Sequence, residues 1–335
     1  MKALALLVTA ASLLFCADTV PSEVPLITGD FGFLAGLQSG HREFGPKFEP
    51  IVLLPLSGRL LVEAEYSTEL PVERNNGSLG PAVLNHSVEY MQLDYVATNS
   101  ITVVAGYFAT PFGIYKERID PLWIRNFIDT PLLYAVNDNS SAGVMIRGGL
   151  FATPAVKLNY AVSVSGDVEN SQFQASKKTT ERLSVYLPGA RVELGSSFSR
   201  NLGAGPYNTY GFDLTYRPKQ APLEIRGEGL WSGVLGNGYW MEGTYRFPSA
   251  RLGFLRRSQA VLRGESFSPA ESAADLVDGL PDGNSKRISL GWNYWIKDAV
   301  RASIAYERLW SRAEDTNVLS LALVYRFSLP VGRAQ

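Results

Sequence analysis

Apolar and polar residues alternate along the second half of the chain, from about residue 207 to residue 327. One apolar run occupies every second position, at Tyr210, Phe212, Leu214 and Tyr216. A period of two predicts β-strands with one apolar face and one polar face. The alternating segments are about ten residues long, whereas about five or six is usual in soluble sheets. Roughly ten residues is the length that a tilted strand needs to cross a bilayer, so the pattern predicts membrane-spanning strands.

The alternation and the turn residues between its segments predict about sixteen strands, with about fourteen or twelve as alternatives. The expected strands span 31–39, 49–56, 59–67, 86–97, 101–110, 141–150, 155–166, 180–187, 190–199, 207–217, 222–232, 237–247, 253–266, 285–297, 300–311 and 316–327.

The lengths of the predicted connections depend on strand parity. Connections after even-numbered strands are all short, while several after odd-numbered strands are long, at 40–48, 68–85, 111–140, 167–179 and 267–284. Bacterial outer-membrane barrels have short periplasmic turns and longer outer loops. The chain is therefore predicted to be an all-β protein, a transmembrane antiparallel β-barrel with this arrangement of turns and loops.

The N-terminus has the pattern of an export signal. Lys2 precedes an apolar run from Ala3 to Phe15, which is too short to be a membrane-spanning helix. We expect residues 1–17 to be a signal peptide and 18–335 to form a single outer-membrane β-barrel domain. Lipidation of Cys16 is an alternative, which the bulky Phe15 before it disfavours.

Composition narrows the choice of partners. The formal net charge is −1, with 31 basic and 32 acidic side chains, which gives no sign of a nucleic-acid partner. Cys16 is the only cysteine, so the mature chain forms no internal disulfide. The expected partners are outer-membrane lipid, lipopolysaccharide and the outer-membrane assembly machinery. Aromatic residues gather near predicted strand ends, as in the girdles at membrane interfaces.

The polar face of the alternation is expected to line the barrel lumen. Its lumen-facing candidates are Arg147, Arg191, Asp213, Arg217, Glu224, Arg226, Glu228, Glu242, Arg246, Arg301 and Glu307. Acidic and basic groups nearly cancel, whereas rings of one sign set a strong selectivity. These groups act either in transport or as structural ion pairs across strands. Arg256 and Arg257 break the alternation, which requires a bulge or one outward-facing arginine.

The segment 111–140 is long and rich in apolar residues, so it is expected to pack on the inner wall. It follows the strand that ends in Pro111-Phe112-Gly113. Its charged side chains are candidates for a pore constriction, at Lys116, Glu117, Arg118, Asp120, Arg125 and Asp129.

Several phrases of the sequence resemble one known family. They include Gly106-Tyr107-Phe108-Ala109-Thr110-Pro111-Phe112-Gly113, Trp123-Ile124-Arg125, Ser141-Ala142-Gly143-Val144 and Ser289-Leu290-Gly291-Trp292-Asn293-Tyr294. From about residue 105 to residue 327 the chain is similar to the phosphate-selective porin O and P family. The resemblance implies a sixteen-stranded porin that forms a homotrimer and has segment 111–140 as its constriction loop.

The sequence thus predicts an outer-membrane porin, a passive diffusion channel for small hydrophilic solutes and a route for ions, with anions such as phosphate as one class. A non-conducting barrel with a binding or structural role is the alternative, and a soluble β-sandwich is another. Catalysis is not expected, because neither His41 nor His86 has a recognisable nucleophile nearby in sequence. No cofactor or metal is expected, although the acidic segment 271–284 has oxygens of the kind that calcium binds.

Overall fold

The computed structural model describes residues 24–137, 140–170, 172–203, 205–248, 250–271, 273, 280–281, 283–312 and 315–331. The predicted signal peptide lies outside the described residues, as do Asp275, Asp278 and Asp282 of the acidic segment.

The described chain is almost entirely strand. The strands of the main sheet are β1 Leu26–Gln38, β2 His41–Ser57, β3 Leu60–Glu69, β4 Val72–Asn75, β5 Ser78–Leu79, β6 Asn85–Thr98, β7 Ile101–Ala109, β8 Ser140–Ala152, β9 Lys157–Gly166, β12 Lys178–Leu187, β13 Val192–Asn201, β14 Asn208–Tyr216, β15 Leu223–Ser232, β16 Gly236–Arg246, β17 Ser258–Pro269, β18 Ser285–Lys297, β19 Val300–Trp310 and β20 Thr316–Pro330. β10 Val168–Glu169 and β11 Gln174–Ala175 form a separate hairpin. The helices are a π-helix at Tyr115–Ile119, a 3₁₀ helix at Tyr134–Asn137 and α1 Gly253–Arg256.

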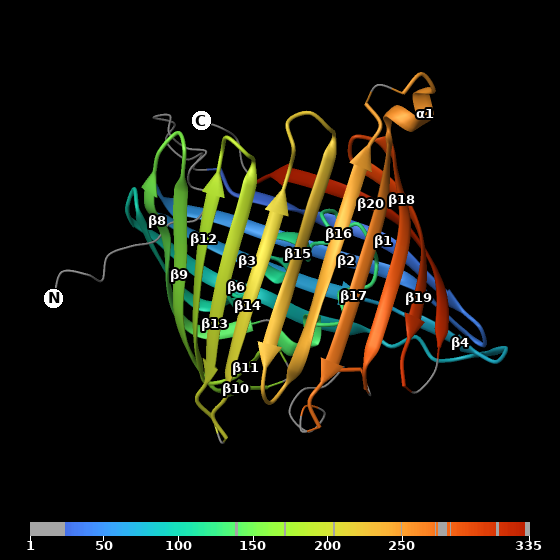
Figure 1. Ribbon diagram of the computed structural model, residues 1–335, viewed down its shortest axis with the longest axis horizontal. Coiled ribbons are helices and arrows are strands. Elements are labelled where there is room, and N and C mark those ends of the chain that lie inside the picture. Colours follow the sequence, from blue (N-terminus) through green and yellow to red (C-terminus); the bar gives the residue numbers. More distant parts are fainter. Residues whose placement is uncertain are drawn as a thin grey trace.

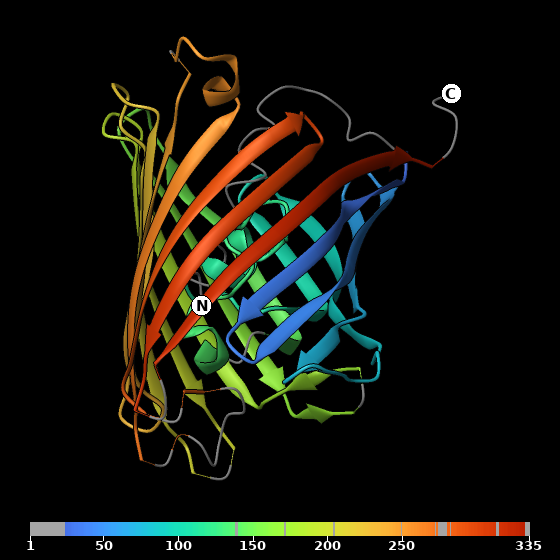
Figure 2. The same cartoon turned by 90° about the vertical axis from the view of Figure 1, so that its right-hand side faces the viewer.

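Neighbouring strands pair antiparallel all the way round, so the sheet closes into a barrel (Figures 1 and 2). β1 pairs with β2 on one side and with β20 on the other, from Leu26 opposite Pro330 to Gln38 opposite Val318. β4 and β5 form a short hairpin beyond β3, so sixteen of the described strands build the wall. The prediction of a closed antiparallel barrel with about sixteen strands is confirmed.

The two faces of the wall differ as the alternation predicts. On β1, Phe31 and Phe33 lie on the outer face and are 46% and 48% exposed, while Asp30 lies on the inner face and is 3% exposed. Girdle aromatics such as Trp231, Tyr239 and Tyr325 also lie on the outer face and are about half exposed. An apolar outer surface of this kind is what a lipid environment requires. Among the described residues, no helix has the length and apolar character needed to span a membrane.

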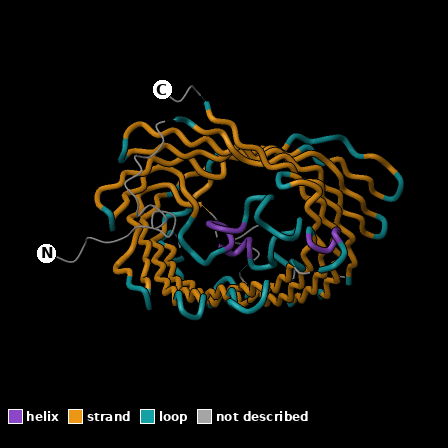
Figure 3. Tube along the Cα trace, turned by 90° about the horizontal axis from the view of Figure 1, so that it is seen from above, coloured by secondary structure: helices purple, strands orange, loops and turns teal. Residues whose placement is uncertain are grey.

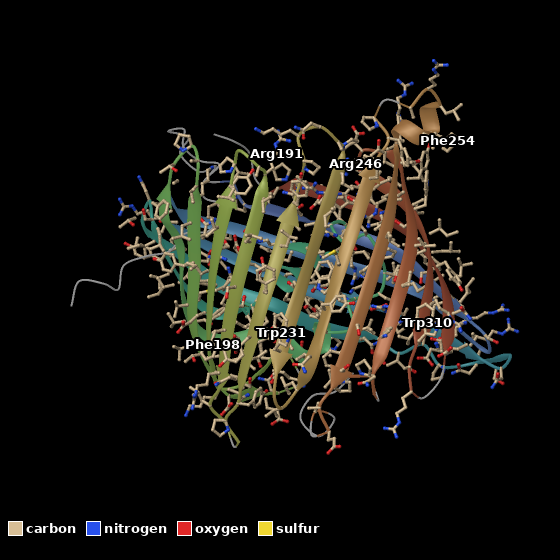
Figure 4. All side chains as sticks on the ribbon, viewed as in Figure 1. Arg191, Phe198, Trp231, Arg246, Phe254 and Trp310 are labelled. Carbon is tan, nitrogen blue, oxygen red and sulfur yellow. The ribbon has the colours of Figure 1, made fainter. Side chains whose placement is uncertain are left out.

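The two ends of the barrel differ in their connections. Tight turns such as 58–59, 99–100 and 298–299 lie at one end, here named the short-turn end, and the connections 70–84 and 270–284 lie at the other, the long-loop end. Figure 4 places Arg191, Arg246 and Phe254 at the short-turn end, and Phe198, Trp231 and Trp310 at the long-loop end.

One predicted long loop is wrong. Segment 40–48 belongs to β2, which begins at His41 directly after a tight turn at Gly40. Pro46 and Pro50 obscured this strand, because proline is uncommon inside sheets and weakens a strand prediction. The alternation nevertheless continues through it, since Phe44 and Phe48 lie on the outer face and Glu49 on the inner face.

The predicted start of the thirteenth strand is also wrong. The connection between β16 and β17 extends over 247–257 and contains α1, so the strand begins only at Ser258. Arg256 and Arg257 therefore lie in the connection at the short-turn end, and Arg257 Nη1 donates to Ile296 O at 3.0 Å. Neither arginine has to face lipid within the wall, which removes the break in the alternation.

Candidate pore constriction

The connection between β7 and β8 folds into the barrel, where its helices lie within the ring of strands (Figure 3). Its apolar side chains form a buried cluster with inward-facing residues of the wall. The cluster comprises Phe112, Ile114, Tyr115, Ile119, Leu133 and Val136 of the connection with Leu230, Leu235, Trp240 and Phe267. Burying this apolar surface is favourable. The apolar residues of segment 111–140 therefore pack on the inner wall, as the sequence predicts. This connection is called the lumenal loop below.

Glycines of the wall make room for rings of the lumenal loop. A Cβ atom on Gly211 would lie 2.6 Å from Phe112 Cε1, and one on Gly291 would lie 2.8 Å from Phe127 Cε1. Carbon atoms pack at about 3.5–4.0 Å from one another, so a Cβ atom at either position would overlap the phenylalanine ring. The two inward-facing glycines are therefore seats for Phe112 and Phe127.

Filling either seat should displace the loop. Gly211→Leu or Gly291→Leu is expected to lower the free energy of unfolding by about 2 kcal/mol, because an overpacked site forces its neighbours to move. Single-channel conductance should change with it. Gly243→Leu is the matched control, since a Cβ there has nothing within 4 Å. Unchanged unfolding and conductance in both seat variants would contradict the assignment.

Carboxylates of the wall accept hydrogen bonds from the loop backbone. Glu228 on β15 accepts from Ile114 N and from Tyr115 N, the latter at 2.6 Å. Glu49 accepts from Leu122 N at 3.1 Å, and Glu265 accepts from Leu132 N at 2.7 Å. Asp30 accepts from Trp123 N at 3.3 Å. Hydrogen bonds to charged groups are among the stronger ones, so these carboxylates fasten an irregular segment that lacks sheet partners.

Arginines of the wall donate to carbonyl groups of the same segment. Arg301 donates to Leu122 O at 2.8 Å and to Trp123 O at 2.9 Å. Arg263 donates to Asp129 O at 2.9 Å, and Arg287 donates to Thr130 O. Charged groups of the lumen wall thus serve in part as struts for the loop.

Most charged residues of the loop are themselves neutralised. Lys116 forms ion pairs with Glu89 of β6 and with Asp120 at 3.0 Å. Arg118 pairs with Glu193 of β13 at 2.7 Å. Because β6 and β13 lie on different parts of the wall, these two pairs tie the π-helix across the lumen. Burial opposes ionisation of Asp120, but Lys116 nevertheless lowers the pKa of this carboxyl group below its usual range.

The remaining predicted constriction residues are placed as follows. Glu117 is half-buried in the π-helix, and its pKa is lowered, against the effect of burial, by Arg118, Arg182 and Arg147. Asp129 lies 3.7 Å from Arg287. Arg125 is only 6% exposed, and it forms no ion pair with any residue that the structure describes.

Beside Arg125 there is an open space within the lumen. This cavity has a volume of about 380 Å³ and lies between the loop segment 125–130 and the inner faces of β1, β2 and β20. Its charged lining consists of Arg125, Lys47, Glu43, Glu69 and Asp129, with His41. The loop thus fills one side of the lumen and leaves a polar space along the other.

Five of the predicted lumen-facing residues take part in cross-strand ion pairs, namely Arg147, Asp213, Arg226, Glu242 and Glu307. Arg147 pairs with Asp94 at 2.6 Å, and Asp213 pairs with Arg182 at 2.8 Å. Arg226 Nε donates to Glu242 at 2.9 Å. Glu307 lies 3.4 Å from Arg287 and accepts from Ser289 Oγ at 3.0 Å.

Four of the predicted residues lie at the short-turn end instead. Arg191 is not on the lumen wall: it lies in the turn before β13, with a φ of 54°, because the strand begins at Val192 and not at residue 190 as expected. Arg217 follows β14 and pairs with Glu224 at 2.8 Å in an exposed position. Arg246 stacks over the Trp295 ring at 4.6 Å.

Sequence reasoning missed several residues that hold the loop, namely Asp30, Glu49, Arg263, Glu265 and Arg287. Asp30 and Glu49 were missed because the bounds of β1 and β2 were misjudged. Arg263, Glu265 and Arg287 did carry a signal, since they occupy inward positions of the alternation in β17 and β18. Of the two histidines, His41 contacts Asn75 and His86 contacts Gln172.

Comparison with known proteins gives matches in structure only. No protein-family model matches the chain, and no curated protein matches it in sequence. OprB of Pseudomonas putida, in its high-pH structure, is 10% identical with a TM-score of 0.61, covering 91% of this chain and 94% of that one. The outer-membrane channel DcaP of Acinetobacter baumannii is 10% identical with a TM-score of 0.56, covering 90% and 97%. OmpT of Vibrio cholerae, an outer-membrane protein in a trimer form, is 10% identical with a TM-score of 0.56, covering 91% and 100%. The chain therefore has the sixteen-stranded barrel fold that is found in outer-membrane channels.

Proposed function

We propose that the protein is an outer-membrane porin, a passive diffusion channel for small hydrophilic solutes. The observation that carries this proposal is the polar cavity left between the lumenal loop and the β1, β2 and β20 wall. Barrels of about eight strands fill their interiors with side chains, whereas those of about sixteen leave an aqueous channel. The similarity in fold to the channel DcaP supports the same function.

We further propose that anions such as phosphate are among the solutes. Of the three basic residues in the loop's first half, Lys116 and Arg118 are held in ion pairs. Arg125 lines the cavity and forms no ion pair with a described residue, and Glu49 and Asp120 act on its charge only at longer range, so it is the loop cation that remains available to a passing anion. The resemblance to the phosphate-selective porin O and P family points the same way. The acidic side chains of the lining favour modest rather than strong anion preference.

Arg125→Gln should therefore lower the preference for anions. In a planar bilayer with a salt gradient, wild-type protein should give steady conductance. In the variant, the anion-to-cation permeability ratio obtained from the reversal potential should fall several-fold. Arg118→Gln combined with Glu193→Gln is the control, because it removes an ion pair of the lumen without changing the net charge. Identical reversal potentials in wild type and Arg125→Gln would exclude Arg125 as the selecting group. Folded protein without any conductance would instead favour a non-conducting barrel with a binding or structural role.

We also propose where the protein is located in the cell and how it is oriented in the membrane. Residues 1–17 act as the export signal, residues 18–335 form the barrel domain, and the assembly machinery inserts it into the bacterial outer membrane with the long-loop end outside. The barrel assembles as a homotrimer, a state supported by the trimer form of OmpT with the same fold. Chemical crosslinking of the protein in native membranes should yield a species of three times the monomer mass.

A further inference from the structure

A row of outward-facing residues crosses six strands near the long-loop end of the barrel. Each member lies directly opposite the next in the strand register, in the order Phe212, Gly229, Tyr239, Ser266, Lys286 and Trp310. Small residues alternate with aromatic ones, and a lysine lies near one end. Figure 4 shows that Trp231 and Trp310 lie at this end of the barrel. The row offers aromatic side chains and one cationic side chain, so it suits a ligand that has an apolar part and an anionic part.

The part of the row over β14 to β17 is a groove. Its volume is about 430 Å³, with Gly227 and Gly229 in the floor and Phe212, Tyr239 and Met241 in the walls. The two glycines place no side chain on the surface, so the groove is cut into the layer of aromatic and aliphatic groups around it. The exposed surface is apolar, which suits a hydrocarbon chain.

The other part of the row is a second hollow, of about 310 Å³, lined by Lys286, Trp310 and Arg312 together with serines. Ser266 lines both hollows, so they lie next to each other along the row. Within the described part of the chain, Lys286 and Arg312 take part in no ion pair, whereas the nearby Arg308 pairs with Asp315 at 3.0 Å. Two uncompensated cations therefore adjoin one end of an apolar groove.

We propose that this row binds one lipopolysaccharide molecule, with a phosphate of its lipid A against Lys286 and Arg312 and an acyl chain in the Gly229 groove. The proposal rests on the proposed outer-membrane placement, in which the long-loop end faces the lipopolysaccharide leaflet. Basic residues beside a membrane surface attract anionic headgroups, and aromatic side chains such as Trp310 suit the interface. Charge complementarity favours this ligand over a second copy of the chain, because Lys286 and Arg312, which form no ion pair among the described residues, are both cations.

Native mass spectrometry of the folded, detergent-purified protein, titrated with diphosphoryl lipid A, tests the site. Wild type should retain one lipid A per chain. Lys286→Gln with Arg312→Gln should weaken binding roughly thirty-fold, since each basic residue near a membrane surface contributes about 1 kcal/mol. Gly229→Leu, which fills the groove, should weaken it about tenfold. The matched controls are Lys297→Gln, at the far end of β18, and Gly243→Leu, which lines neither hollow.

The possible results distinguish failure of the lipid site from failure of the proposed channel. Equal lipid A binding in wild type and in both site variants overturns the lipid site. Loss of trimers in lipid-free Gly229→Leu protein also overturns it, since the groove would then hold a second copy. Conductance of the same preparations is measured separately, so a protein that binds lipid A without conducting contradicts the channel and leaves the lipid site supported.

Discussion

Replacing Glu228 by alanine is expected to lower the free energy of unfolding by about 4 kcal/mol and to raise single-channel conductance. The Glu228 carboxylate is 6% exposed and accepts from Ile114 N, Tyr115 N and Trp240 Nε1. Each buried donor left without an acceptor costs about 1–3 kcal/mol. Two of these donors belong to the start of the lumenal loop, so their release should free the loop from β15 and widen the passage.

Urea unfolding in detergent, together with bilayer recording, measures both effects. Glu224→Ala is the matched control, because Glu224 lies on the same strand and its ion pair with Arg217 is exposed. Its cost should stay below about 1 kcal/mol, the usual range for surface ion pairs. A Glu228→Ala protein with wild-type stability and conductance would show that the loop is held without this carboxylate.

Arg263→Met should be comparably severe, lowering the free energy of unfolding by about 3–5 kcal/mol, because it leaves the buried carboxylates of Glu265 and Glu307 to share the one counter-charge of Arg287. The Arg263 side chain is 1% exposed, pairs with Glu265 at 2.7 Å and lies 3.9 Å from Glu307. It also donates to Asp129 O and stacks on the Phe127 ring at 4.6 Å. One residue therefore joins β17, β19 and the lumenal loop.

A second substitution distinguishes charge from lost packing. Adding Glu307→Gln to Arg263→Met removes one of the two carboxylates that lost Arg263 as a partner. The double variant should therefore recover part of the stability measured by urea unfolding. Arg217→Met serves as the reference, since its guanidinium group is 62% exposed and should cost less than about 1 kcal/mol. If the double variant is less stable than Arg263→Met, the loss comes from packing and hydrogen bonds instead of from uncompensated charge.

The fold was largely predictable because alternation is a local property of each strand. Tyr210, Phe212 and Leu214 reveal an outer face without any knowledge of the neighbouring strands. Prediction failed where local signals were weakened, at Pro46 and Pro50 in β2 and at residues 253–257, the end of the connection that contains α1. Proline and a short helix change the local pattern without changing the course of the barrel wall.

The site was predictable only in part, because ion pairing depends on partners far apart in sequence. The loop residues Lys116, Arg118 and Arg125 carry equal charges in sequence. Glu89 and Glu193, distant along the chain, form ion pairs with the first two, while the third forms no ion pair with a described residue. The glycines at 211 and 291 show the same limit, since only the folded structure reveals Phe112 and Phe127 against them.

The attachment of the lumenal loop also sets an order of events in biogenesis. The loop leaves β7, yet Glu228, Glu265, Arg287 and Arg301, which hold it, lie more than ninety residues later in the chain. A growing or partly inserted chain thus carries an apolar segment whose earlier partners, such as Asp30 and Glu49, are already present while its later partners are not. The segment must wait, shielded from aggregation, until the C-terminal strands are in place. Narrowing of the lumen is consequently completed late, and a barrel arrested before β19 would lack the hydrogen bonds that Arg301 donates to Leu122 and Trp123.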